Sequence, residues 1–239
     1  ANYFFPGTST IQTRAKYFLL VPYELQDFIR TGYRANSNTS LFVEENQKEI
    51  DKKERLTAVK LKENCSTDAE TSGIIGARSL TVNEWVERAP LSIYWNGLRT
   101  FGFFRTVNPN FTFADFLALL NNIERNRIES KKSDSSSKDE KDDDDAGNYA
   151  KKCPLIKLPT YTKNWRTKVD IELTNAEALF LKDKIIKCVP DSLLAFILKN
   201  NIDISDCTDF ETLTYKLSKK VNADLRNKME MANKANDFY

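Results

Sequence analysis

One proline inside an amphipathic stretch, Pro90, most constrains what this chain can fold into. Proline has no backbone N–H and disfavours a helical residue before it, so a helix that reaches Ala89 must end there. Proline is also favoured at the first position of a new helix. Apolar residues recur at helical spacing on both sides of Pro90. The sequence therefore predicts two helices, 82–89 and 91–101.

A helix stop and a run of strand-forming residues follow the second helix. Gly102 is a typical helix terminator, and the aromatic and β-branched run 103–107 predicts a strand. The turn 108–110 would join this strand to another at 111–113, as a minimal wing. We therefore predict a mainly α fold, a helical domain with a winged-helix-like helix-turn-helix segment (74–113) and a few short strands.

The outer face of the 91–101 helix carries one polar stripe, in which Ser92, Asn96 and Arg99 fall at helical spacing. Asparagine and arginine can make paired hydrogen bonds to adenine and guanine edges in a major groove. Arg88 and Arg105 flank the stripe and are placed to meet phosphates. These five residues form the predicted site for double-stranded nucleic acid. Any amphipathic helix has a polar outer face, so a structural or protein-binding role stays open.

Composition favours helices and excludes several classes of function. Only 7 glycines and 7 prolines occur in 239 residues. No apolar run approaches the roughly 18 residues of a membrane span, and no signal peptide is visible, so we expect a cytoplasmic protein without membrane contact. The absence of histidine excludes every mechanism that needs an imidazole. The four cysteines show no CxxC pair, so we predict no metal site and no cofactor.

These exclusions argue against an enzyme. One alternative is a metal-dependent nuclease with Lys168, Asp170 and Glu172 on one face of a strand. Ordinary exposed strand charges explain that spacing better.

Helical periodicity and capping patterns predict further helices. The first helical unit spans 8–34, with Pro22 bending or ending its first part, and a solvated helix spans about 42–63. Capping pairs start helices at Thr112 and Thr174, and Ser192 starts a short helix through Lys199. A long helix runs from about Asp209 past Met231. Its narrow apolar seam suits a helix of a partner protein or the chain's own core, and consists of Leu213, Leu217, Val221 and Leu225.

An acidic, serine-rich tract divides the chain. Residues 129–146 contain 8 acidic and 4 basic side chains, so the remainder carries a net charge of +6 rather than the +2 of the whole chain. The tract cannot bury enough apolar area to fold. We therefore predict a helical domain over 1–128, an acidic disordered linker or loop over 129–149, and a helical C-terminal region over 150–239.

Three blocks of sequence resemble a known bacterial family. They are FFPGTSTIQTRAKYFLLVP (4–22), GIIGARSL with PLSIYWNGLRTFGFFR (73–80 and 90–105), and LTNAEALFLKDKII with SLLAF (173–186 and 192–196). They resemble, in the same order, the domain-of-unknown-function family numbered 6361. Members of that family are longer at both ends, which implies that the chain is a fragment.

The resemblance implies no catalytic residues. It implies an accessory protein of prokaryotic mobile or defence-associated loci, beside helicase-like and nuclease-like genes. Two hypotheses follow. The protein binds nucleic acid through the 91–101 helix, or it is a scaffold subunit that binds other proteins through its C-terminal helix.

Overall fold

The computed structural model describes residues 3–66, 68–81, 84–106, 108–134 and 155–236. The chain forms two compact units, Gly7–Phe180 and a second that combines Ala1–Pro6 with Leu181–Tyr239. The boundary between the units lies inside one helix. Residues 155–180 thus belong to the larger unit, and the first residues of the chain belong with the last ones.

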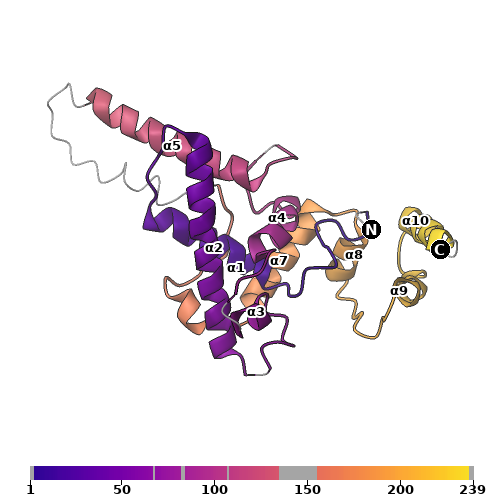
Figure 1. The fold of residues 1–239 in the computed structure, drawn as a ribbon. Coiled ribbons are helices and arrows are strands. Elements are labelled where there is room, and N and C mark those ends of the chain that lie inside the picture. Colours follow the sequence, from indigo (N-terminus) through magenta and orange to yellow (C-terminus); the bar gives the residue numbers. More distant parts are fainter. Residues whose placement is uncertain (1–2, 67, 82–83, 107, 135–154, 237–239) are drawn as a thin grey trace. The chain divides into compact units, whose positions relative to one another are not determined.

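Helices dominate the described residues, as predicted (Figure 1). The α-helices of the larger unit are α1 (Tyr17–Thr31), α2 (Thr39–Asn64), α3 (Ala77–Thr81), α4 (Pro90–Thr100) and α5 (Phe113–Asp134), with a 3-10 helix, η1 (Trp165–Lys168). The remaining helices are α7 (Asn175–Cys188), α8 (Leu193–Lys199), α9 (Phe210–Leu217) and α10 (Ala223–Asn236). None of the helices in the described ranges is both long and apolar enough to cross a membrane.

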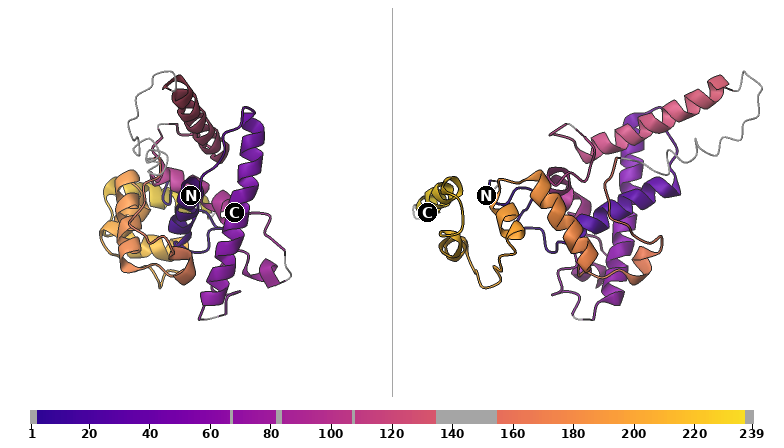
Figure 2. Two further views of the ribbon diagram at one scale, coloured as in Figure 1. Left: turned by 90° about the vertical axis from the view of Figure 1, so that its left-hand side faces the viewer. Right: turned by 180° about the vertical axis from the view of Figure 1, so that it is seen from behind.

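Helix α2 is the axis of the larger unit, and α1, α3, α5 and η1 all contact it (Figures 1 and 2). Its start is capped by Asn38, whose side chain accepts a hydrogen bond from the Leu41 amide at 3.2 Å. One stripe of α2 is buried and the rest is solvated, which matches the predicted helix at 42–63. Buried on this stripe are Phe42, Ile50, Glu54, Thr57, Ala58 and Leu61.

Helix α1 begins later than predicted and does not break at Pro22. Residues 8–16 form turns, in which the Ser9 amide donates to the Gln12 side chain at 3.2 Å. Gln12 in turn donates to the carbonyls of Gly7 and Ile93, so its amide holds a turn rather than a helix start. Pro22 lies in the early part of the helix, which continues to Thr31.

The predicted helix at 82–89 is wrong over 84–89, and residues 82–83 lie outside the described residues. Residues 84–89 are not helical, and only the second helix, α4, forms after Pro90. The physical reason lies in Trp85, whose ring packs over Gly76 so closely that a Cβ there would come within 2.7 Å of it. The apolar residues that mimic a helical stripe are thus used for contacts to other parts of the chain. Helix α4 therefore has no helix-turn-helix partner at 84–89.

The predicted wing is wrong in the described part of 103–113. Phe104 makes an antiparallel bridge to Ile156 instead of pairing with residues 111–113. The Arg105 amide donates to the Leu155 carbonyl at 2.9 Å, and the Lys157 amide donates to the Phe103 carbonyl at 2.7 Å. The segment prefers a distant partner because both Phe103 and Phe104 are buried there.

The acidic tract begins inside a helix. Helix α5 continues to Asp134, so the first residues of the predicted linker are helical. Arginine, lysine and glutamate favour helices, which accounts for the extension. Residues 135–149 lie outside the described residues, so the rest of the predicted linker stays a prediction.

The prediction of one long C-terminal helix is wrong, because the segment forms two helices, α9 and α10. Asn222 ends the continuity by accepting from the Leu225 amide at 2.8 Å, the geometry of a helix N-cap. The predicted seam is buried in the core of its own unit. That core contains Phe4, Leu193, Ile197, Leu213, Leu217, Val221, Leu225 and Met229.

Helix α4 lies against the start of α1 through a glycine. A Cβ at Gly97 would lie 2.3 Å from the Gly7 carbonyl oxygen and 2.5 Å from a ring carbon of Phe18. Real Cβ atoms do not approach so closely, so only glycine permits this packing.

Two carboxyl groups are buried in the core of the larger unit. Glu24 of α1 and Glu54 of α2 are 3% and 1% exposed. Burial raises the pKa of Glu24 to about 8, although Thr57 and Arg166 favour its charged form. Burial and then the neighbouring Glu24 raise the pKa of Glu54 well above its ordinary value. Both side chains are therefore stabilised in their neutral form.

Gly97→Ala tests the close approach of α4. In a solvated helix, alanine would add stability relative to glycine. Here the Cβ meets the Gly7 carbonyl, so we expect a loss of about 3 kcal/mol in the free energy of unfolding. Chemical denaturation measures the loss. Gly32→Ala is the control, because its φ of 84° is strained for alanine but no atom lies within 4 Å of the new Cβ; it should cost about 1 kcal/mol.

The raised pKa of Glu24 predicts how the free energy of unfolding depends on pH. Its pKa is raised in the folded state, so the unfolded chain loses the proton first as pH rises. The protonated Glu24 therefore contributes fully to the free energy of unfolding below its ordinary pKa of 4.5, and this contribution is lost as the pH rises to about 8. We expect the unfolding free energy to fall by up to about 1.4 kcal/mol per pH unit in this range.

Glu24→Gln should flatten this pH profile and raise stability at pH 8 relative to the native protein. The exposed Glu44, which pairs with Lys48, supplies the control Glu44→Gln. Denaturation at several pH values distinguishes them, and an unchanged slope in Glu24→Gln contradicts the assignment.

Candidate functional site

Helix α4 is anchored through its inner face. Leu91, Tyr94 and Leu98 are buried. The Tyr94 hydroxyl donates to the Arg14 carbonyl at 2.8 Å and accepts from the Arg14 amide at 3.0 Å. These contacts fix which side of α4 faces solvent.

The first turn of α4 is held by a side chain of α2. The first backbone N–H groups of a helix have no partner within the helix, and Pro90 itself has no N–H group. The next amide, that of Leu91, donates to Glu54 Oε1 at 2.5 Å. A buried carboxyl from a distant helix therefore replaces a local cap.

The outer face of α4 carries the predicted stripe. Ser92 and Asn96 are exposed and Arg99 is half-buried. The Arg99 guanidinium donates to Asn96 Oδ1 at 2.8 Å, so these two side chains form one unit on the surface. Ser92 donates to the Ala89 carbonyl at 2.9 Å, which ties its hydroxyl to the helix start. The structure therefore brings Asn96 and Arg99 together.

The two flanking arginines are exposed but are held by different segments. Arg88 lies in the irregular segment before α4. Arg105 follows the bridge between Phe104 and Ile156, which holds its backbone. Arg88, Arg99 and Arg105 make no ion pair with a carboxylate among the residues that the structure describes. By contrast, Arg78 lies 3.5 Å from Glu70.

Aromatic packing supports the outer end of this region. The Trp95 indole N–H donates to the Phe111 carbonyl at 2.9 Å. Its ring packs against four phenylalanines, namely Phe104, Phe111, Phe113 and Phe116. Trp95 thus fixes α4 relative to the segment that leads into α5.

A second cationic feature, which sequence reasoning missed, lies beside α1 and η1. A cavity of about 510 Å³ is lined by Arg30, Lys53, Lys163 and Arg166, and Asp27 is the one carboxylate among its described lining residues. Arg166 lies 3.5 Å from Asp27 and donates to the Thr57 hydroxyl at 3.0 Å. The four cations come from three separate parts of the sequence, so no local pattern reveals them.

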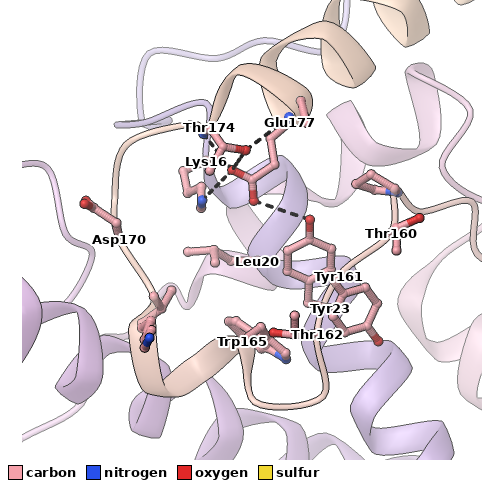
Figure 3. A pocket seen from close by; sticks show the side chains of 14 residues that line it. Lys16, Leu20, Tyr23, Thr160, Tyr161, Thr162, Trp165, Asp170, Thr174 and Glu177 are labelled. Carbon is pink, nitrogen blue, oxygen red and sulfur yellow. Dashed lines mark hydrogen bonds and ion pairs between the residues drawn. The ribbon is translucent and has the colours of Figure 1, made fainter.

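Another cavity, of about 260 Å³, is shown in Figure 3, where α1 meets the start of α7. Lys16 Nζ lies 2.6 Å from Glu177 Oε2, and the same oxygen accepts from the Thr174 amide at 2.8 Å. Tyr23 donates to the other oxygen at 3.4 Å. Burial would raise the pKa of Glu177, but Lys16 and Thr174 hold it below its ordinary value. The polar groups at the centre of this cavity bond to one another. We therefore interpret them as a structural link between α1 and the start of α7.

The strand that the nuclease alternative required does not form. Lys168 ends η1, residues 171–172 form a bend, and Asp170 is not in a strand. Glu172 pairs with Arg14 at 3.6 Å, and Asp170 accepts from the Glu172 amide at 3.1 Å. Among the described residues, no cluster of three or more acidic or cysteine side chains is arranged to hold a metal ion.

Comparison with known proteins places the chain in a family. The model of a family of unknown function (DUF6361) matches residues 1–122, about half of the chain. The chain belongs to this family, which confirms the resemblance drawn from the sequence. The match covers α1 to α4 and hence the whole predicted site. No curated protein and no solved structure gave a match.

Proposed function

We propose that this family member binds double-stranded nucleic acid through the outer face of α4. The observation that carries the proposal is a solvent-facing helix surface that carries Arg99 and is flanked in sequence by Arg88 and Arg105, three arginines that lack carboxylate partners among the described residues. An unpaired guanidinium can contact phosphate or a guanine edge without first breaking an ion pair. The proposal includes a cytoplasmic, prokaryotic setting and an accessory role beside helicase-like or nuclease-like proteins, as the family resemblance implies.

The binding mode differs from that of a winged helix, because the described residues form neither a helix at 84–89 nor a wing at 103–113 to support α4. Asn96 and Arg99 would meet base edges, since their hydrogen bond places both side chains together on α4, where Asn96 is exposed and Arg99 half-buried. Arg105, and Arg88 at the other end, would contact phosphates. Ser92 has a smaller role, because its hydroxyl is engaged with the Ala89 carbonyl.

The scaffold alternative loses the surface that suggested it. The seam residues Leu213, Leu217 and Val221 are buried within their own unit and present no apolar stripe to another protein. The nucleic-acid proposal therefore has the better support.

Asn96 and Arg99 supply the test. We expect Asn96→Ala with Arg99→Ala to weaken binding of a fluorescein-labelled duplex by at least about tenfold, because each base contact contributes about 1–3 kcal/mol. Arg105→Ala should lower affinity for all sequences and reduce the slope of log affinity against log salt by about 1. Fluorescence anisotropy over a salt series measures both effects.

Two comparisons make this test decisive. Arg34→Ala removes an exposed arginine outside α4 and should leave affinity unchanged. Lys53→Ala with Lys163→Ala removes charge from the cationic cavity. If the cavity variant loses binding while the α4 variants keep it, the α4 site is rejected.

A further inference from the structure

An acidic cavity of about 380 Å³ lies beside the start of α4. It is bounded by α2, by the irregular segment before α4 and by the start of α5. Three carboxyl side chains line it, together with three aromatic rings and no lysine or arginine among the described lining residues. The residues that matter here are Asp51, Glu54, Glu87, Trp85, Trp95 and Phe113.

Two of the residues that line this cavity each have one buried polar atom with no hydrogen-bond partner among the described residues. These atoms are Glu54 Oε2, an acceptor when ionised, and Trp85 Nε1, a donor. The Glu54 side chain is 1% exposed, and its other oxygen is occupied by the Leu91 amide. Each unsatisfied buried group costs roughly 1–3 kcal/mol. A ligand with both an N–H donor and an acceptor would remove both penalties.

The charge and the rings select the class of ligand. Carboxylates favour a cation, and the planar guanidinium group donates to carboxylates while stacking on aromatic faces. An ammonium group lacks this planar fork and is more strongly hydrated. The volume lies within the range of small-molecule sites.

We propose that this cavity binds a small molecule that carries a guanidinium group and a nearby carbonyl. The guanidinium donates to Glu54 Oε2 and to Asp51, with its plane against the indole rings. The carbonyl accepts from Trp85 Nε1. Ser92 of the polar stripe also lines this cavity, but the proposal does not rest on the nucleic-acid function, and either can fail without the other.

Burial raises the pKa of Asp51, as it does that of Glu54. A bound guanidinium would favour the ionised form of both groups.

The test compares two probes of equal shape. N-acetyl-L-arginine amide carries a guanidinium, whereas N-acetyl-L-citrulline amide replaces it with a neutral urea, and both offer amide carbonyls. We expect the arginine probe to bind at least about tenfold more tightly in calorimetry. It should also shift the indole N–H resonance of Trp85 in an ¹⁵N-labelled sample.

Two variants locate the site. Glu54→Gln keeps an oxygen for the Leu91 amide but removes the charge, so the preference for the arginine probe should disappear. Asp51→Asn makes the same test at a less buried position, where the fold does not depend on the carboxyl. The preference of the Asp51→Asn variant for the arginine probe over the citrulline probe should fall severalfold.

Three outcomes overturn the proposal. They are equal affinity for the two probes, no binding of the arginine probe at about 10 mM, or an arginine preference that survives in both variants. Duplex binding by the same samples reports separately on α4, so failure at the cavity is not confused with failure of the nucleic-acid site.

Discussion

The hydrogen bond from the Leu91 amide to Glu54 joins the two helices on which the larger unit depends. It gives a partner to the Leu91 amide, the first backbone N–H of α4 after Pro90. The acceptor is a carboxyl buried in α2. The start of α4 is thereby fixed against the central helix. Its end is fixed by the contact of Gly97 with Gly7. Both the outer face of α4 and the acidic cavity beside its start follow from these two constraints.

The same carboxyl explains why stability and site chemistry are linked. Glu54 lies near Glu24, and burial favours the neutral form of each. A core made only of apolar side chains would be more stable, since a buried acid with one unsatisfied oxygen is costly. The Glu54 side chain also lines the acidic cavity, where the proposed ligand would satisfy that oxygen.

Local signals in the sequence predicted local structure well. Pro90 marks the start of α4, and the pairs Thr112–Asp115 and Thr174–Glu177 form the capping hydrogen bonds that their spacing indicated. The exposed polar stripe also follows from helical periodicity alone. These features depend on residues within one or two turns of each other.

Some failures are local, such as the N-cap at Asn222 that separates α9 from α10, but others involve contacts between distant residues. Trp85 has helical spacing to its neighbours, yet its ring packs on Gly76, and no local rule reveals that choice. Phe103 and Arg105 find backbone partners at Lys157 and Leu155, beyond the acidic tract. The buried Glu24 had one visible signal, because it interrupts a run of α1 that is otherwise apolar on all sides, as in a helix with no solvated face.

Phe4 gives the smaller unit an unusual dependence on both ends of the described chain. Its carbonyl accepts from the Leu194 amide at 3.0 Å, and its ring packs 5.2 Å from that of Phe210. During synthesis, this residue emerges long before the helices that bury it. Contacts of such long sequence separation form slowly. The core of the smaller unit therefore cannot be completed until residues from both parts of the chain are present.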